Sequence, residues 1–296
     1  MWIAEFLKDA KVLLAITSVL GTMVVFIFGT FKPKKKALNP EKYQPFVLKQ
    51  KLALSHDTRM FRFALQSPKH VLGLPIGKHV SMKFVGSDGK TVTRSYTPTT
   101  SDLHEGYVDF VIKVYFPNVD PRFPEGGKMS MHLEGLEEGS TMDMMGPKGN
   151  LTYLGVGNFR INRRDDRKVR KLGMMAGGTG ITPMLQIISA ILRERTKIDM
   201  SLIFANKTID DILLRDLIDD LVAKNPNFKV HFTVDKAPAD WKYSQGFITK
   251  EMVEKHMPPP GDSTLVLMCG PPPMLKYACI PALEGLKYSE EMYFSF

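Results

Sequence analysis

The chain has 296 residues and a net charge of +9, with 24% charged and 44% hydrophobic residues. This composition is that of a globular protein, and the length suits two domains that each bury a core. Cys269 and Cys279 are the only cysteines. Two thiols without a CxxC pair exclude a disulfide framework and a cysteine zinc site, and they fit a reducing compartment.

The first predicted element is a membrane-spanning helix near the N-terminus. Residues 12–31 carry no charged side chain, and at 1.5 Å rise per residue they just cross a bilayer core of roughly 30 Å. Lysines follow this run, so the rest of the chain is expected in the cytosol. A cleaved signal peptide is the rival interpretation, which the length of the run and the position of the charge disfavour. We therefore expect an anchor over 1–31 and a basic tether over 32–45.

Positive charge gathers in two runs. Lys32, Lys34, Lys35 and Lys36 form the first, and the second extends from Arg160 to Lys171. Such runs are either solvated linkers or surfaces that attract an acidic membrane or an acidic partner, and the sequence leaves both open. Nucleic acid is not expected as a partner, because no recognition module surrounds the basic residues.

Residues 46–155 have the pattern of an antiparallel β-barrel. Between Val108 and Phe116 one face is apolar and the other mixed, with the period of two that a strand requires. The stretch from Gly86 to Gly89 is typical of a hairpin turn. Several short strands at this spacing predict an antiparallel barrel.

After a basic linker over 156–170, residues 171–296 alternate strands with helices. Strands are expected over 201–205, 228–234 and 264–268, with a helix beginning near Asp210. This alternation predicts an α/β domain with a parallel sheet, where ligands bind beyond the carboxyl ends of the strands. Gly177, Asp235 and Cys269 all follow or end such strands, so we expect them to share one crevice.

The glycine cluster within residues 172–183 is the most informative motif. A short apolar run ends at Gly177, Gly178 and Gly180, whose missing Cβ atoms let the backbone lie close to a ligand. Thr182 is expected to cap the following helix and Pro183 to begin it. Strand, turn and helix N-terminus together favour a phosphate or a flat cofactor. Pro183 stands where the Rossmann GxGxxG pattern has its third glycine.

Two further motifs give this cluster its context. Arg94-Ser95-Tyr96-Thr97-Pro98 lies upstream, and Cys269-Gly270-Pro271-Pro272-Pro273-Met274 lies downstream. In this order the three motifs resemble the ferredoxin–NADP reductase superfamily of flavoproteins. With 127–130 (GKMS), 211–215 (DILLR) and 245–247 (QGF), the chain from about residue 46 to its end is similar to the NADH–cytochrome b5 reductase family. The resemblance implies FAD and NADH as cofactors and cytochrome b5, an acidic membrane-bound haem protein, as acceptor.

The flavin site is expected on the barrel. Arg94 and Tyr96 share a strand face, so the guanidinium can bind a pyrophosphate and the ring can lie flat on another ring. The resemblance assigns Arg94 to FAD phosphate, Tyr96 to the isoalloxazine and Thr97 to flavin N(5), with His79 beside Thr97. Ser95 stands where many relatives have proline.

Other flavin contacts come from two segments. Gly126 and Gly127 can expose successive N–H groups to an anion, and Ser130 is expected to cap a helix. By resemblance, Lys128, Met129 and Ser130 bind the pyrophosphate after Gly127. The resemblance also assigns the flavin lining to Val111, Lys113 and Phe116. For Lys113 a solvent-facing strand position is the alternative.

The NADH site is expected at the strand ends of the α/β domain. Asp235 can accept hydrogen bonds from ribose hydroxyls and repel a 2′-phosphate, which favours NADH over NADPH. Phe247 either flanks the adenine or belongs to the core. Cys269 is expected to pack against the nicotinamide without acting as a nucleophile. The remaining predicted coenzyme contacts are Gly178, Thr179, Gly180, Thr182, Gly270 and Pro271.

These residues predict an FAD enzyme that takes a hydride from NADH and passes electrons singly to cytochrome b5. Thr97, His79 and Cys269 are the candidate catalytic residues, and Phe296 at the chain end lies near the flavin by resemblance. No metal site is expected. The alternatives are a nitrate reductase-like flavin fragment, which the missing haem and molybdenum domains disfavour, and an inactive nucleotide sensor, which the intact Tyr96, Thr97 and Cys269 disfavour.

Overall fold

The computed structural model describes residues 34–119, 124–162 and 166–296. Lys36–Phe296 form one compact unit. The predicted anchor over 1–31 lies outside the described residues. Among those that the structure describes, no helix is long and apolar enough to cross a membrane.

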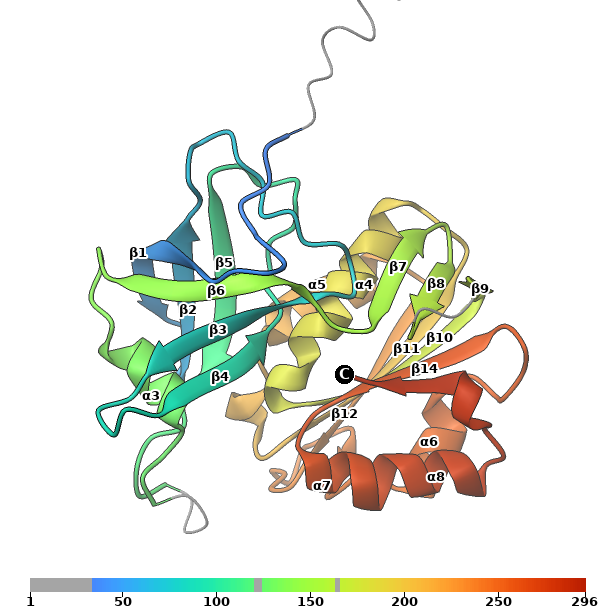
Figure 1. The fold of residues 1–296 in the computed structure, drawn as a ribbon. Helices are drawn as coiled ribbons and strands as arrows, with labels where there is room; N and C mark the ends of the chain where they lie inside the picture. Colours follow the sequence, from blue (N-terminus) through green and yellow to red (C-terminus); the bar gives the residue numbers. More distant parts are fainter. Residues whose placement is uncertain (1–33, 120–123, 163–165) are drawn as a thin grey trace, which may run out of the picture. The chain divides into compact units, whose positions relative to one another are not determined.

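The first lobe of the compact unit is an antiparallel sheet of six strands, as predicted (Figure 1). The strands follow one another in the order β4-β3-β6-β1-β2-β5 and wrap around one apolar cluster, which includes the fully buried Phe46, Phe61 and Phe110. The elements of this lobe are β1 (Gln44–Ala53), β2 (Thr58–Ala64), β3 (His79–Val85), β4 (Thr91–Tyr96), β5 (Tyr107–Lys113), α3 (Lys128–Gly135) and β6 (Thr141–Lys148).

The packed body of this lobe begins before Phe46. Lys36 pairs with Val71 in an isolated bridge, and the Ala37 N–H donates to the Val71 carbonyl at 2.9 Å. Ala37 and Leu38 are buried in the same apolar cluster as the strands. The described part of the expected tether is therefore attached to the first lobe from residue 36 onward.

A small three-stranded sheet, β7-β8-β9, connects the two lobes. Its strands are β7 (Leu151–Gly155), β8 (Asn158–Ile161) and β9 (Arg167–Lys168). The stretch that we expected to be a basic linker thus supplies two strands. Arg167 donates to the backbone carbonyls of Asp262 and Thr264 at 3.2 and 2.7 Å, and Arg160 pairs with Asp166 at 2.7 Å. The guanidinium groups of Arg160 and Arg167 are therefore used, at least in part, for contacts within the protein. Arg163 and Arg164 lie outside the described residues.

The second lobe is a parallel six-stranded sheet in the order β13-β12-β11-β10-β14-β15, which confirms the predicted α/β domain. Helices α4 and α5 pack on one face, and α6 and α8 pack on the other. The elements are β10 (Lys171–Gly177), α4 (Ile181–Arg193), β11 (Asp199–Asn206), α5 (Arg215–Lys224), β12 (Phe228–Val234), β13 (Ser244–Gln245), α6 (Lys250–His256), β14 (Thr264–Cys269), α7 (Pro272–Met274), α8 (Ile280–Gly285) and β15 (Tyr293–Ser295).

The helix expected from Asp210 begins later. Ile209–Asp211 form a short 3-10 turn, in which Thr208 and Asp211 cap each other's backbone N–H groups. Leu214 then takes a left-handed φ of 55°, and α5 starts at Arg215. The apolar spacing predicted a helix here, but not the turn that delays it.

Candidate active site

Two loops at the carboxyl ends of neighbouring strands touch in the second lobe. The 3-10 turn Gly178–Gly180 follows β10, and Gly270 follows Cys269, the last residue of β14. A Cβ atom on Gly180 would lie 2.0 Å from the Cys269 carbonyl oxygen, and one on Gly270 would lie 3.1 Å from the Gly177 nitrogen. Only glycine allows this approach, since any side chain would push the loops apart. The glycine and cysteine motifs thus form one surface, as the strand ends predicted.

The predicted cap of α4 is wrong. Gly180 holds the N-cap position, and Thr182 lies inside the first turn. The buried Thr182 hydroxyl donates to the Thr179 carbonyl at 3.1 Å, so it braces the glycine turn from within. Because no side chain caps α4, the free N–H groups of its first turn and the positive end of its dipole remain for an anion.

The carboxyl end of β12, two strands along the sheet from β10, carries an exposed carboxylate and an exposed ring. Asp235 follows β12, and Gly246 donates from its N–H to the Val234 carbonyl at 2.9 Å, which brings Phe247 beside that strand end. Phe247 is 79% exposed, so the alternative of a core phenylalanine is wrong. Partial burial raises the pKa of Asp235; the Lys207 ammonium opposes this, and the Asp211 carboxylate adds to it.

The Cys269 side chain is suited to packing. Burial raises the pKa of its thiol to about 11, so the thiol stays protonated at neutral pH. A protonated thiol is a poor nucleophile, in agreement with its predicted packing role. Cys279 is fully buried in the cluster beneath α6 and α8, where burial raises its pKa to about 12.

Strand β4, which carries Arg94, and helix α3 are neighbours in the first lobe. The exposed Arg94 uses one of its several N–H donors on the Thr93 carbonyl, at 2.8 Å. Strand β4, which carries Arg94, contacts α3, and α3 begins after Gly127 with no side-chain cap. The Arg94 guanidinium and the free N–H groups at the start of α3 are both donors of the kind that bind phosphate groups.

The side chains of the GKMS motif are arranged differently from the prediction. Gly127, not Ser130, is the N-cap of α3. The Ser130 hydroxyl accepts from the Tyr115 N–H at 3.1 Å and donates to the Gly127 carbonyl at 3.0 Å, and Met129 is buried in the apolar cluster. Ser130 and Met129 therefore offer their backbone N–H groups to an anion. Lys128 is exposed, with its ammonium 3.8 Å from Asp88.

His79 and Thr97 lie across a strand pair. Val80 pairs with Tyr96 in the antiparallel register of β3 and β4, so His79 and Thr97 are the next residues beyond the last pair of the two strands. Burial, and then the nearby Lys78, lowers the pKa of His79, so its imidazole is neutral at neutral pH. Ser95, which directly precedes Tyr96 on β4, pairs with Ser81 of β3 and is exposed.

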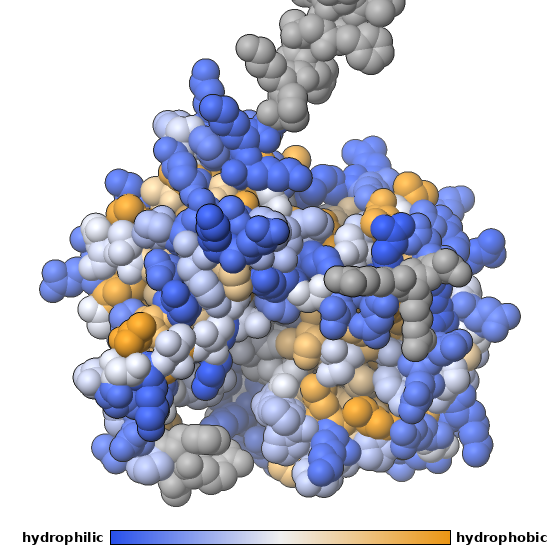
Figure 2. Space-filling model, in the orientation of Figure 1, coloured by the Kyte–Doolittle hydropathy of each residue, from blue (hydrophilic) through white to orange (hydrophobic). Residues whose placement is uncertain are grey.

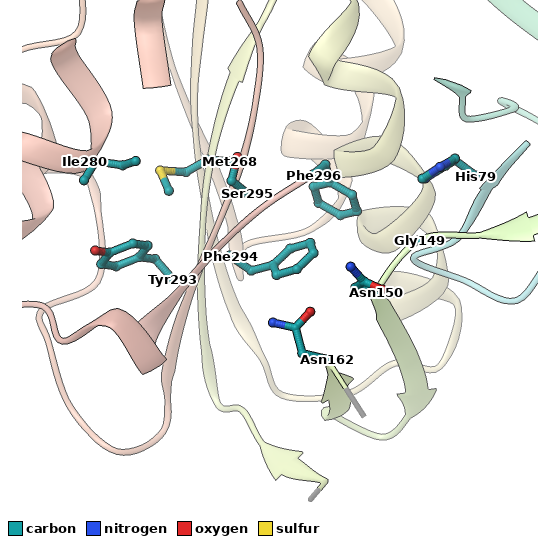
Figure 3. A pocket seen from close by; sticks show the side chains of 10 residues that line it. All are labelled: His79, Gly149, Asn150, Asn162, Met268, Ile280, Tyr293, Phe294, Ser295 and Phe296. Carbon is teal, nitrogen blue, oxygen red and sulfur yellow. The ribbon is translucent and has the colours of Figure 1, made fainter. Parts of the chain in front are cut away.

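A cavity of about 390 Å³ opens between His79 and the C-terminal strand (Figure 3). The rings of Phe294 and Phe296 line it from β15 and the chain end, with their centroids 5.3 Å apart. In Figure 2, apolar colouring gathers around this strand on an otherwise mostly hydrophilic face. Asn150 and Asn162 line the cavity beside these rings, and sequence reasoning missed both. The Asn162 φ of 52° is one that asparagine tolerates, but no sequence signal tied it to a cavity.

Lys113 joins the two lobes. Its ammonium lies 2.6 Å from Asp57 in the first lobe and 2.6 Å from Asp211 in the second, and the side chain is 13% exposed. The alternative of a solvent-facing lysine is therefore wrong. The two carboxylates raise the pKa of Lys113 against the opposing effect of burial. His56, Asp57 and Asp211 are near enough to hold a metal ion, but the Lys113 ammonium already pairs with both carboxylates.

Val111 and Phe116, two further residues predicted to contact the flavin, lie on β5 and just after it. Val111 is buried, on the strand face opposite Phe110 and Ile112. Phe116 is partly exposed, and the Arg59 guanidinium lies 5.7 Å from its ring centroid. Their place beside a flavin stays a prediction.

Comparison with known proteins decides the family. Residues 45–153 match the model of an oxidoreductase FAD-binding domain, and residues 174–279 match an oxidoreductase NAD-binding domain. The chain is 47% identical to human NADH-cytochrome b5 reductase 1 over 304 residues, covering 98% of this chain and 99% of the relative. It is 46% identical to rat NADH-cytochrome b5 reductase 3, covering 99% of both. The chain belongs to the NADH-cytochrome b5 reductase family.

A solved structure agrees with this family assignment. The cytochrome b5 reductase domain of Ulva prolifera nitrate reductase superposes with a TM-score of 0.84 at 41% identity. The match covers 88% of this chain and all of that domain. The protein is accordingly an FAD-dependent NADH oxidoreductase.

The residues of this reductase fit FAD. The exposed Arg94 guanidinium and the uncapped N-terminus of α3 supply the donors that a pyrophosphate needs. Tyr96, two residues after Arg94 on β4, packs partly against the apolar cluster, and its remaining surface can take a flat ring. Bound FAD supplies the chemistry of hydride acceptance and single-electron release. Arg94 and the backbone N–H groups at the start of α3 would hold its phosphates, while burial keeps the Cys269 thiol and the His79 imidazole neutral.

Proposed function

We propose that this reductase passes electrons from NADH through FAD to cytochrome b5 at a membrane surface. The observation that carries the proposal is the contact of the glycine turn with Cys269–Gly270, which forms a coenzyme surface in one lobe. The exposed Arg94 and the uncapped N-terminus of α3 in the other lobe support the flavin assignment. The names of the relatives support cytochrome b5 as the acceptor.

Within this proposal, each predicted residue has a defined task. Arg94 and the backbone of Gly127, Lys128, Met129 and Ser130 bind the FAD pyrophosphate. Tyr96, Thr97 and His79 orient the flavin, with Ser95, Val111, Lys113 and Phe116 around it. On the NADH side, the contacts are Gly178, Thr179, Gly180, Thr182, Asp235, Phe247, Cys269, Gly270 and Pro271.

The apolar run over 12–31 supports a single-pass anchor that leaves both lobes on the cytosolic side. The membrane is that of the endoplasmic reticulum or the mitochondrial outer membrane, whose anchors are alike. An acceptor held on the same membrane would be at a raised effective concentration. A reductase module within a nitrate reductase is the second candidate, favoured by the Ulva likeness. Relatives at higher identity carry the cytochrome b5 reductase name over nearly their whole length.

Salt dependence tests the docking of the acceptor. If the net charge of +9 steers an acidic cytochrome, the second-order rate of cytochrome b5 reduction should fall as salt rises. Exposed charges are screened beyond a Debye length of about 10 Å at 0.1 M, and steering acts mainly on association. Flavin reduction by NADH should respond far less, and stopped-flow absorbance separates the two steps. A flat salt response would contradict electrostatic docking.

The basic run is tested by a double variant, Arg163→Gln with Arg164→Gln. Arg167 is left intact because it binds backbone carbonyls. If the run is the docking face, the variant should weaken the salt response, whereas the exposed Lys229→Gln should leave it unchanged. A salt response in the double variant as steep as in the wild type would show that the docking face lies elsewhere on the protein.

Replacing Asp235 with threonine should narrow the preference for NADH over NADPH. The change removes the carboxylate that would repel a 2′-phosphate, and it weakens ribose binding. The ratio of kcat/KM for the two coenzymes measures the effect, and we expect a fall of about tenfold or more, as for the loss of one charged contact. Asp240→Thr removes a nearby exposed charge as the control. An unchanged ratio in Asp235→Thr would show that Asp235 does not face the ribose.

A further inference from the structure

Gln186 links the two lobes through its amide. It lies on α4 of the second lobe, and its Oε1 accepts from the Gly77 N–H at 2.7 Å. Its Nε2 donates to the Lys78 carbonyl at 3.4 Å. Gly77 and Lys78 belong to the first lobe and directly precede His79, the first residue of β3. One side chain of the coenzyme lobe therefore holds the backbone next to the flavin-side histidine.

The segment that Gln186 holds has little freedom of its own. Gly77 has a φ of 91°, and a Cβ atom there would lie 2.5 Å from the Leu151 side chain. The Ile76 carbonyl accepts from the Tyr153 N–H at 2.9 Å. Residues 76–78 thus contact α4 on one side and β7 on the other. A displacement of α4 would therefore also move His79, the next residue.

Strand β7 is fastened to the far end of the same helix. The Tyr153 hydroxyl donates to Glu194 at 2.5 Å, and the Val156 N–H donates to the same carboxylate at 2.8 Å. Glu194 is the C-cap of α4. The helix is therefore held at its middle by residues 77–78 and at its end by the connecting sheet, while its beginning carries the glycine turn.

We propose that Gln186 is a positioning residue that sets the spacing between the glycine turn and His79. Since the proposed function places nicotinamide at the glycine turn and flavin beside His79, Gln186 would fix the distance between the two rings. The inference rests on that function. Hydride transfer is steeply sensitive to this distance, and a displacement of about 1 Å can cost on the order of 100-fold in rate.

The Lys113 ion cluster is a second link between the lobes, but it is of a different kind. It joins Lys113 at the end of β5 to Asp211, whereas Gln186 joins α4 to the start of β3. The amide carries no charge, so salt should not weaken its two hydrogen bonds. The two links can therefore be tested separately.

The experiment compares Gln186→Met, which keeps the length of the side chain and loses both hydrogen bonds, with Gln186→Glu, which keeps the acceptor for Gly77. Ser189→Ala, on the same helix, is the control. Hydrogen–deuterium exchange of residues 76–79 reports directly whether Gln186 holds this segment, and it does not require enzyme turnover. Stopped-flow flavin reduction at varied NADH separates the limiting rate from the coenzyme Kd.

In Gln186→Met we expect exchange over 76–79 to rise about fivefold, because of the two lost bonds only the one from the Gly77 N–H protects an exchanging amide. Exchange over 94–97 and flavin content should stay unchanged. The limiting rate of flavin reduction should fall about tenfold, with the NADH Kd within about twofold of wild type, because distance and not affinity changes. The absorbance of the charge-transfer complex between reduced flavin and NAD⁺ should weaken, and Gln186→Glu should restore most of each property.

Unchanged exchange in Gln186→Met would show that the Gln186 hydrogen bonds do not hold residues 76–79. Raised exchange with an unchanged limiting rate would overturn the positioning role, and so would an equal fall of the limiting rate in Ser189→Ala. A wild-type protein whose flavin NADH does not reduce would instead refute the proposed function. In that case the exchange measurement would still decide whether Gln186 holds the segment.

Discussion

Replacing Gly180 with alanine should abolish NADH-driven flavin reduction while FAD stays bound. The new Cβ atom would lie 2.0 Å from the Cys269 carbonyl oxygen and 2.5 Å from its carbon, both of them backbone atoms that cannot rotate away. The glycine turn and Cys269–Gly270 must then separate, which opens the predicted nicotinamide surface. We expect the rate of flavin reduction to fall at least about 100-fold, since a displacement of about 1 Å has that effect.

Gly261→Ala is the matched control for Gly180. Gly261 lies in the same lobe before β14, and the nearest atom to an added Cβ there is the Thr264 hydroxyl at 3.9 Å. This variant should reduce its flavin at the wild-type rate. Wild-type flavin reduction in Gly180→Ala would show that contact between the two strand-end loops is not required for NADH use.

Replacing Arg94 with alanine should release FAD while the affinity for NADH changes little. Arg94 is the exposed cation of β4, the strand that contacts α3, so its loss removes a charge-assisted contact to the pyrophosphate. Such a contact contributes roughly 1.5–3 kcal/mol, which corresponds to about 10- to 150-fold weaker FAD binding. Flavin absorbance after gel filtration, with titration of the apoprotein, measures both retention and Kd.

Lys90→Ala removes a charge next to the same strand and serves as the control for Arg94. Lys90 is exposed in the turn before β4, and its loss should leave FAD binding within about twofold of wild type, as for a surface charge. Full flavin occupancy in Arg94→Ala, or an equal loss in Lys90→Ala, would refute the assignment of Arg94.

The sequence predicted those parts of the fold that depend on local pattern. Period-two alternation around β5 and the strand-to-helix alternation after Lys171 were enough for an antiparallel lobe and a parallel lobe. The strand ends also located Gly177, Asp235 and Cys269, because the carboxyl ends of parallel strands lie along one edge of the sheet.

Helix caps were predicted less well. Thr182 and Ser130 are residue types that favour N-caps, yet each lies in the first turn of its helix, and a glycine precedes that turn in both cases. A hydroxyl in the first turn can also bond back to a nearby carbonyl, as Thr182 does to Thr179 and Ser130 does to Gly127. Residue type alone does not distinguish the two arrangements.

Contacts between distant residues could not be predicted. Lys113 reaches Asp211, 98 positions further along the chain, and Gln186 reaches Gly77, 109 positions back. Neither link has a periodic signature, because each depends on how the two lobes meet. Asn150 and Asn162 were missed for the same reason, since they line the cavity through the fold of β7 and β8.

The absorption spectrum of the purified protein, recorded without oxygen before and after one equivalent of NADH, tests the central claim most directly. The claim is that one chain binds FAD and lets NADH reduce it. We predict a flavin spectrum that bleaches on addition of NADH and returns when oxidised cytochrome b5 is added. A protein without flavin absorbance, or a flavin that NADH leaves oxidised, would contradict the account.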